Sequence, residues 1–436
     1  MKKSKHKELE ELLKYQISSR ILQNNSIIKS FQNKEKYVNN VTTMKDTFYN
    51  LLDVLVDNET NIIKNLNEKI AEKTDRNIKL IFYDTTTIYF EIFVREWLRI
   101  PRYSKDGKFK EDQVVVGMAT DSNGIPMFLK VFKGNIGDPT TFIPFIVDLK
   151  KTYNIQKVTI IADRGVSTNK NIRFLESHNL DYIISYRLKL SNKGFKDFSL
   201  NPEGYIKGSD NFKYKEYFYY SKRKNKRTNN KQRRIIITYS EKRAKKDLND
   251  RTILMKNFLK KQNKNGVVKA DDVILIKKYK FYKKVGNMKF VLDAEKVNED
   301  KKYDGYYVYE TSRQDLSPKE IVDFYQKQWQ IEENIRTFKS ALRVRPVHVR
   351  TDKHIKGHFI LNFISLIVLK YTLYKLNKFY FDNGVIQKYT NDSLISLLNT
   401  CNQINKIRDG QVIERSFVEP TINSNSEQEF DEINNI

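Results

Sequence analysis

A short strand-like run that ends on an acid most constrains the fold of this chain. Residues 157–163 read KVTIIAD, and the apolar and β-branched run ends at Asp163. Such a run is typical of a strand covered on both faces, as in a parallel sheet. A helical segment (168–179) and another strand (181–187) follow, so a right-handed crossover is expected. The chain is therefore predicted to be an α/β protein.

The preceding residues predict the antiparallel part of a mixed sheet. Residues 79–93 are rich in β-branched and aromatic residues, which favours a strand. Residues 113–133 read as two strands joined at Asn123-Gly124, a strong hairpin signal because both residues tolerate positive φ. A helix should then start at Asp138-Pro139, with Asp138 as its N-cap. The order strand, hairpin, helix, strand, helix, strand indicates a mixed sheet with flanking helices.

Helices are predicted in the N-terminal region and in the last third of the chain, and an acidic tail follows them. Residues 1–78 carry apolar residues at helical spacing, and this helical region either contacts DNA or serves packing or dimerisation. After a strand at 305–311, a capping box at Ser317 opens a long helix that should run to about Leu342. An apolar helix over 354–376 follows. The tail from Glu419 has five acids and no Lys or Arg, and is expected to be disordered.

A basic segment, residues 188–304, interrupts the α/β pattern. Strands are expected at 233–240 and 271–282, with a helix between them, so it is a β-rich insertion. The predicted organisation has five parts: a helical N-terminal region (1–78), a catalytic core in two parts (79–187 and 305–376), the insertion (188–304) and a C-terminal region (377–436).

Positive charge dominates the composition. The chain has 80 Lys and Arg against 53 Asp and Glu, a net charge of +27, which favours a nucleic-acid partner. AT-rich codons are an alternative source of the lysine excess. Between positions 221 and 246 there are twelve Lys and Arg and one acid. This stretch is either a solvated surface or a contact to phosphate backbone, for which the candidate residues are Arg223, Arg227, Arg233 and Arg234.

Membrane and extracellular classes fit poorly. The longest apolar stretch, 359–369, is shorter than the roughly twenty residues that span a bilayer. The N-terminus has no apolar signal region, and a single cysteine, Cys401, forms no internal disulfide framework. A cytoplasmic protein without a membrane partner is expected.

Two acids are expected at strand ends. Asp84 and Asp163 each close a strand-like run, and adjacent parallel strands would bring them about 4.8 Å apart. An acid at the end of a buried run needs a cationic partner. Arg164 and a metal ion are both candidates.

A third acid lies in the long predicted helix. Tyr325, Glu332 and Lys339 are spaced by seven, so each lies about 20° from the last around a helix. The stripe is either functional or the polar edge of an amphipathic helix. Three carboxylates suit Mg²⁺ or Mn²⁺, and two such ions about 3.5–4 Å apart can promote an in-line displacement at a phosphodiester.

The sequence resembles a known family at several blocks. FYQKQWQIEENIRTFKSALRVRPVHVR (324–350) resembles the Y-x2-R-x3-E-x6-K signature of insertion-sequence DDE transposases, the family four group. YDTTTIYFE, GNIGDPTTFIP and TIIADRG resemble the blocks around the first two aspartates of that family. The likeness covers roughly residues 79–187 and 305–375.

The resemblance implies a ribonuclease H-like fold, with a β-rich insertion before the last acid. Asp84, Asp163 and Glu332 would be the catalytic triad that holds two Mg²⁺ (or Mn²⁺) ions. The residues implied to position the DNA end are Tyr325, Trp329 and Lys339. Gln328, a further DNA-binding candidate, stands in the Arg position of the signature and lacks its charge and bidentate geometry. Binding of the DNA end is therefore expected either to be weaker or to use Lys327 or Arg336 instead.

The predicted function is that of a DNA transposase. It would cleave double-stranded DNA at the inverted-repeat ends of a transposable element and join the freed 3′-OH to target DNA. The resemblance implies a homodimer acting on two ends, in the bacterial cytoplasm at the nucleoid. Two alternatives stay open: a ribonuclease H-like nuclease without strand transfer, and a decayed, non-catalytic DNA-binding copy.

Overall fold

The structure is a computed structural model that divides into two compact units. Unit 1 comprises Met1–Val158 and Lys327–Ile436, and unit 2 comprises Thr159–Gln326. Each unit is described by itself. The described residues are 2–37, 41–74, 76, 78–90, 97–101, 111–208, 212–220, 232–260, 281–286, 289–345, 347–386, 388–400, 402–408 and 411–418.

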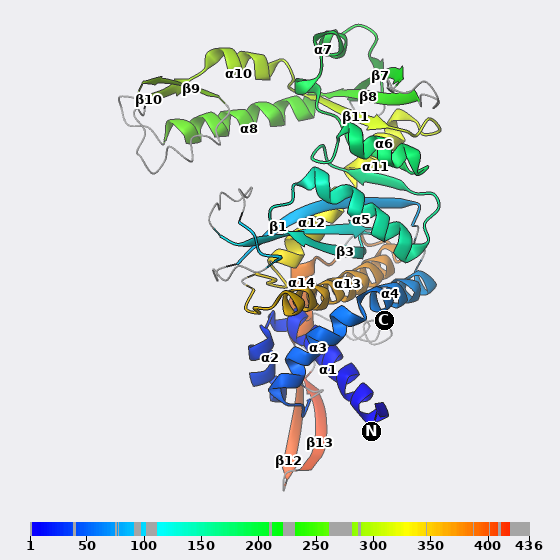
Figure 1. The fold of residues 1–436 in the computed structure, drawn as a ribbon, viewed down its shortest axis with the longest axis vertical. Coiled ribbons are helices and arrows are strands. Elements are labelled where there is room, and N and C mark those ends of the chain that lie inside the picture. The colour runs from blue at the N-terminus through cyan, green and yellow to red at the C-terminus, as the bar shows by residue number, and fades with distance from the viewer. Residues whose placement is uncertain are drawn as a thin grey trace. The chain divides into compact units, whose positions relative to one another are not determined.

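The N-terminal region of unit 1 is helical, as predicted. Its helices are α1 (Lys2–Gln23), α2 (Ile27–Gln32), α3 (Lys45–Asp57) and α4 (Glu59–Lys73). Their apolar stripes explain the packing: α3 buries Phe48, Leu51, Leu52 and Leu55 and contacts the long helix α13 (Asp352–Asp382). Unit 1 thus has a helical core on its N-terminal side (Figure 1).

Unit 1 contains three neighbouring antiparallel strands in the order β3-β2-β1. They are β1 (Leu80–Tyr89), β2 (Gln113–Thr120) and β3 (Pro126–Lys133). The β2–β3 turn differs in detail from the expected one, since Gly124 has a positive φ (80°) and Asn123 does not. Instead the Asp121 Oδ1 atom accepts the backbone N–H groups of Asn123 and Ile125, both at 2.9 Å. Asp121 thereby fixes the turn.

Helix α5 (Asp138–Tyr153) covers one face of this sheet. A β-carbon on Gly117 of β2 would lie 3.0 Å from the Phe145 ring of α5, so helix and sheet approach closely there. The helix starts within one residue of the predicted N-cap, with Gly137 in the cap position and Pro139 in the first turn. The remaining elements of unit 1 are α12 (Trp329–Lys339), α14 (Asn391–Thr400), β12 (Asn402–Arg408) and β13 (Gln411–Val418).

Helix α13 is the one helix of the described residues that is long and apolar enough to cross a membrane. It has 31 residues, and 67% of its most apolar window is buried inside the protein. It packs against α1, α3 and β3. A core helix of a folded protein passes the same test of length and composition, and burial accounts for its apolar sequence.

Unit 2 contains a six-stranded mixed sheet in the order β4-β5-β11-β8-β7-β6. The strands are β4 (Thr159–Ala162), β5 (Asp181–Ser185), β6 (Ile206–Lys207), β7 (Phe212–Tyr220), β8 (Gln232–Ser240) and β11 (Tyr306–Thr311). Strands β4 and β5 are parallel and joined through α6 (Asn169–Ser177), as predicted, and the other pairs are antiparallel.

The insertion extends this sheet. Strand β8 of the insertion pairs with β11 of the predicted core. The insertion also packs on β11 through a buried apolar cluster of Leu188, Phe195, Ile235, Ile237 and Val308. Its other elements are α7 (Lys193–Leu200), α8 (Glu241–Leu259), β9 (Tyr282–Gly286), β10 (Lys289–Leu292) and α10 (Ala294–Lys301). The strand predicted at 271–282 falls almost wholly outside the described residues.

Two predictions about elements are corrected. The helix expected from Ser317 to Leu342 is broken at Lys327–Gln328 into α11 (Pro318–Gln326) and α12, which ends at Lys339. Asp84 lies in the middle of β1, paired with Met118, and not at a strand end. The capping box is confirmed, because Ser317 Oγ accepts the Glu320 N–H at 3.3 Å while Glu320 Oε2 accepts the Ser317 N–H at 2.7 Å. The mixed α/β class with a helical N-terminal region is also confirmed.

Candidate active site

Asp84 is placed by the alternation of β1. The preceding Tyr83 points to α5, where its hydroxyl lies 2.8 Å from Thr141 Oγ1 and its ring packs on Phe142 and Phe145. Successive side chains of a strand point to opposite faces. The half-buried Asp84 is therefore on the face away from α5, and its Oδ1 atom accepts the Thr85 N–H at 2.7 Å.

Glu332 lies on the helix that packs against the strand of Asp84. Helix α12 contacts β1 and β2, with Ile331, Ile335 and Phe338 buried. Asn334 fixes the helix, since its Nδ2 atom donates to Thr120 Oγ1 (3.1 Å) and to the Gly124 carbonyl (2.9 Å). Glu332 is exposed in the first turn, where a carboxylate interacts favourably with the helix dipole. Two of the three acids are thus on neighbouring elements of unit 1.

Asp163 is held by two hydroxyl groups in unit 2. It follows β4 directly and is exposed. Its Oδ1 atom accepts from Ser185 Oγ at 3.1 Å and from the Tyr325 hydroxyl at 3.4 Å. The Tyr307 hydroxyl donates to the Tyr325 oxygen at 3.2 Å, which completes a chain of three side chains ending at Asp163. Burial raises the pKa of Tyr325 far above its usual range, so its hydroxyl stays protonated and can donate.

This hydroxyl chain was not predicted from the sequence. Ser185 and Tyr307 belong to β5 and β11, which are far apart in the chain but adjacent in the sheet. The available signal was the position of Ser185 at the end of the strand that follows the Asp163 strand. Arg164, the predicted cationic partner, is exposed, and no ion pair joins it to Asp163 in the part of the chain that the structure describes.

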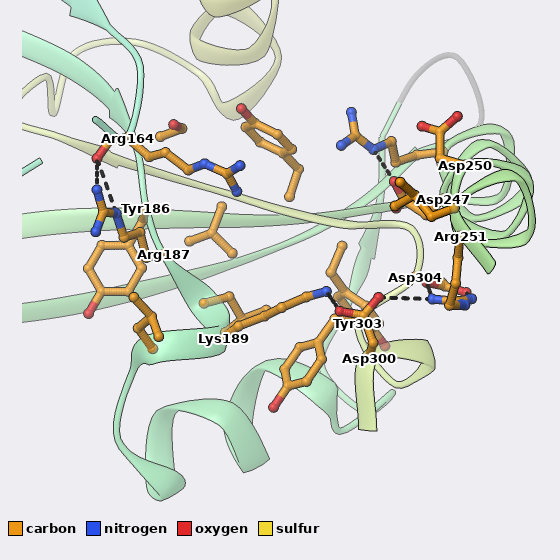
Figure 2. A pocket seen from close by; sticks show the side chains of 18 of the residues that line it. Arg164, Tyr186, Arg187, Lys189, Asp247, Asp250, Arg251, Asp300, Tyr303 and Asp304 are labelled. Atoms are coloured by element: carbon orange, nitrogen blue, oxygen red, sulfur yellow. Dashed lines mark hydrogen bonds and ion pairs between the residues drawn. The ribbon is translucent and has the colours of Figure 1, made fainter. Parts of the chain in front are cut away.

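Unit 2 contains a cavity of about 580 Å³ (Figure 2). Ser185 and Tyr307 line it, together with several cations that are mostly neutralised within the cavity. Arg251 pairs with Asp300 and Asp304, Lys189 pairs with Asp300, and Arg187 donates to the Arg164 carbonyl at 3.0 Å. Arg164, which also lines the cavity, is exposed and directly follows Asp163 in the sequence.

Two arginines of the predicted phosphate surface are buried. Arg233 is 2% exposed and pairs with Glu176 at 2.7 Å and Glu310 at 3.3 Å. Arg234 is 6% exposed, pairs with Glu216 at 2.7 Å and donates to the Leu316 carbonyl at 2.6 Å. The predicted surface position is therefore corrected for both: residues 233–238 of β8 are all buried, and since consecutive side chains point to opposite faces, both faces of the strand are covered there. Arg223 and Arg227 lie outside the described residues.

The signature residues around Glu332 have different environments. Gln328, in the Arg position, is 4% exposed, so its side chain lies inside the fold. Trp329 is 56% exposed and borders an apolar cavity. Arg336 is exposed and paired with Glu333, and Lys339 is half-buried. Because α11 and α12 are separate helices, only Glu332 and Lys339 share a stripe of one helix.

The three acids have the donor chemistry that a hard divalent cation requires. Carboxylate oxygens are the ligands preferred by Mg²⁺ and Mn²⁺. Among the residues that the structure describes, no group of three or more His, Cys, Asp or Glu side chains gathers closely enough to hold a metal ion. Asp84 and Glu332 belong to unit 1 and Asp163 to unit 2.

Comparison with known families identifies the class. The family model described as the transposase DDE domain matches residues 78–368, which is more than half of the chain. The protein therefore belongs to the transposase DDE domain family. Among solved structures, the chain is similar to the piggyBac transposase synaptic complex with hairpin DNA, at 11% identity and a TM-score of 0.41 over 90% of this chain and 70% of that chain. No curated protein matches the chain.

Proposed function

We propose that this protein is a DNA transposase that cleaves the inverted-repeat ends of a transposable element and joins them to target DNA. The observation that carries the proposal is the family match over residues 78–368, a range that contains Asp84, Asp163 and Glu332. The net charge of +27 suits a DNA partner. The protein would act as a homodimer in the cytoplasm, on the bacterial nucleoid.

The proposed reaction has two phosphoryl transfers. In the first, water attacks a phosphodiester at the element end, and the released strand carries a 3′-OH. In the second, that 3′-OH attacks a target phosphodiester, so one P–O bond forms as another breaks and no energy-rich cofactor is consumed. Asp84, Asp163 and Glu332 would hold Mg²⁺ or Mn²⁺, and such ions activate the attacking oxygen and stabilise the leaving one.

The other residues of the site have supporting roles. The hydroxyls of Ser185 and Tyr325 orient the Asp163 carboxylate, with Oδ1 as their common acceptor. Trp329 and Lys339 of α12 would position the DNA end near Glu332. Because Gln328 is buried, Arg336 or Lys327, both exposed, would supply the phosphate contact of the missing arginine.

The triad is tested with DNA that carries the inverted repeats flanking the gene. We expect Asp84→Asn, Asp163→Asn and Glu332→Gln each to abolish Mg²⁺- or Mn²⁺-dependent end cleavage while DNA binding, measured by gel shift, is retained. Asp323→Asn, at an exposed acid of α11 paired with Lys319, is the matched control and should cleave normally. Absence of cleavage by the wild type would favour the decayed copy, and unchanged cleavage by the triad variants would show that these acids are not catalytic.

A further inference from the structure

A second cavity, in unit 1, is cationic and lies apart from the three acids. It has a volume of about 290 Å³ and is formed by the end of α1, the turn into α2 and the segment before α13. Its polar lining includes Arg20, Asn24, Lys29, Arg343, His348 and His358. None of the described side chains that line it is an Asp or Glu. The cavity therefore concentrates positive charge without a protein counter-charge.

Arg20 is the centre of this imbalance. It is 2% exposed, and its Nε and Nη2 atoms have no hydrogen-bond partner among the described residues. Burial lowers the pKa of Arg20 to about 10. A buried charge without a partner is strongly unfavourable. The buried Arg76 and Arg233 illustrate the usual solution, since they pair with Asp121 and with Glu176 and Glu310.

The remaining lining residues favour an anion in the cavity. Lys29, Arg343 and His348 are exposed at its border and could reach a ligand there. Asn24 and Arg343 have positive φ values of 44° and 42°, the left-handed conformation that commonly ends a helix, and they follow α1 and α12. His358 adds no charge, because burial lowers its pKa to about 3 and its Nε2 atom contacts the Val344 carbonyl at 3.0 Å.

We propose that this cavity binds one phosphate-class oxyanion, with Arg20 as the buried anchor and Arg343 as the cation at its border. A guanidinium offers five N–H donors in a planar array, which suits the oxygens of a phosphate. The phosphate is either a free ion or a group of the DNA backbone. The second source rests on the proposed function, and the first does not.

The test uses the full chain with inorganic phosphate, at constant ionic strength with chloride as the control anion. We expect phosphate to raise the melting temperature of the wild type. Arg20→Met and Arg343→Gln should weaken phosphate binding by about tenfold or more, because each removes a charge-assisted hydrogen bond. Lys14→Gln removes an exposed charge of the same helix and should behave as the wild type. Without phosphate, Arg20→Met should melt no lower than the wild type, since it removes an unpaired buried charge.

A second arm measures binding to a short DNA duplex over a range of salt concentrations. If the phosphate belongs to the DNA backbone, free phosphate gives no shift, but Arg20→Met and Arg343→Gln lower DNA affinity and reduce the salt slope by about one. Either pattern supports the anion site and shows whether its phosphate is a free ion or part of the DNA. If neither pattern is seen, or if Lys14→Gln has effects equal to those of the two arginine variants, the proposed site is wrong. Phosphate binding in the first arm is independent of cleavage, so loss of the proposed function would leave this result unaffected.

Discussion

Buried ion pairs decide the role of the arginines in β8. Arg233 contacts two carboxylates, Glu176 and Glu310, and all three side chains are about 2% exposed. Burial raises the pKa of Glu310, and the nearby arginine opposes that effect. The sequence shows the density of positive charge in this segment but not which side chains face inward. The pairing partners come from α6 and β11, which lie 57 and 77 positions away.

Replacing Arg233 should therefore cost stability before it changes DNA binding. We expect Arg233→Met to destabilise the fold by roughly 3–5 kcal/mol, because two carboxylates lose their buried partner. Urea unfolding measures this change. Arg336→Met, at an arginine whose side chain is 74% exposed, should cost at most about 1 kcal/mol. If Arg233→Met left stability unchanged but weakened DNA binding, Arg233 would instead be a surface residue that contacts DNA phosphate.

His358 gives the protein a specific sensitivity to acid. Burial lowers its pKa from 6.5 to about 3 in the folded state. Above pH 6.5 the imidazole is neutral in both states and has no effect. As the pH falls below 6.5, the unfolded chain takes up a proton that the folded chain excludes, so stability decreases by up to about 1.4 kcal/mol per pH unit.

The comparison variant for this effect is His358→Gln, whose amide can still donate to the Val344 carbonyl. The free energy of unfolding of the two proteins is measured between about pH 4 and 8. Its slope against pH should differ by up to about 1.4 kcal/mol per pH unit, which corresponds to the one proton taken up by His358 on unfolding. The wild type should lose stability faster on acidification. Parallel curves would show that His358 is protonated in the fold or does not titrate in this range.

At the scale of elements, the local rules succeed where a turn or cap is encoded by neighbouring residues. The capping box at Ser317 and the crossover through α6 form as the sequence predicts. No proline or glycine in the sequence indicates the break at Lys327–Gln328. It was missed because the apolar spacing continues across it, and the buried side chain of Gln328 is set by tertiary packing.

The contact between α13 and α3 makes a prediction about a single glycine. A β-carbon at Gly357 would lie 2.5 Å from the Leu52 carbonyl oxygen and 2.6 Å from its Cβ. We expect Gly357→Ala to destabilise the fold by about 1–3 kcal/mol despite the higher helix propensity of alanine. A β-carbon at Gly194 in α7 would contact Asn192 Oδ1 at an ordinary distance of 3.7 Å, so Gly194→Ala should be neutral or stabilise by up to about 1 kcal/mol. Thermal unfolding of both variants measures the difference, and equal effects would contradict the close packing.

At the scale of the whole molecule, the chain order of strands and helices was predictable and the site only in part. The apolar run before Asp163 and the signature around Glu332 are local in sequence, so both acids could be named. The bond from Tyr325 to Asp163, and the bond from Tyr307 to Tyr325, could not, because both tyrosines come from elements more than 140 positions after Asp163. The charge of +27 likewise indicates a preference for anions. Only the structure shows which cations, such as Arg233 and Arg234, are instead neutralised by carboxylates inside the fold.

The most direct test of the transposase proposal is strand transfer from a pre-cleaved end. A duplex that carries one inverted repeat with a free 3′-OH is incubated with the full protein, a target plasmid and Mg²⁺ or Mn²⁺. We predict covalent joining of the 3′ end to the plasmid by the wild type, and none by Asp163→Asn or Glu332→Gln. Plasmid that is only nicked, or joining that survives these substitutions, would contradict the proposal.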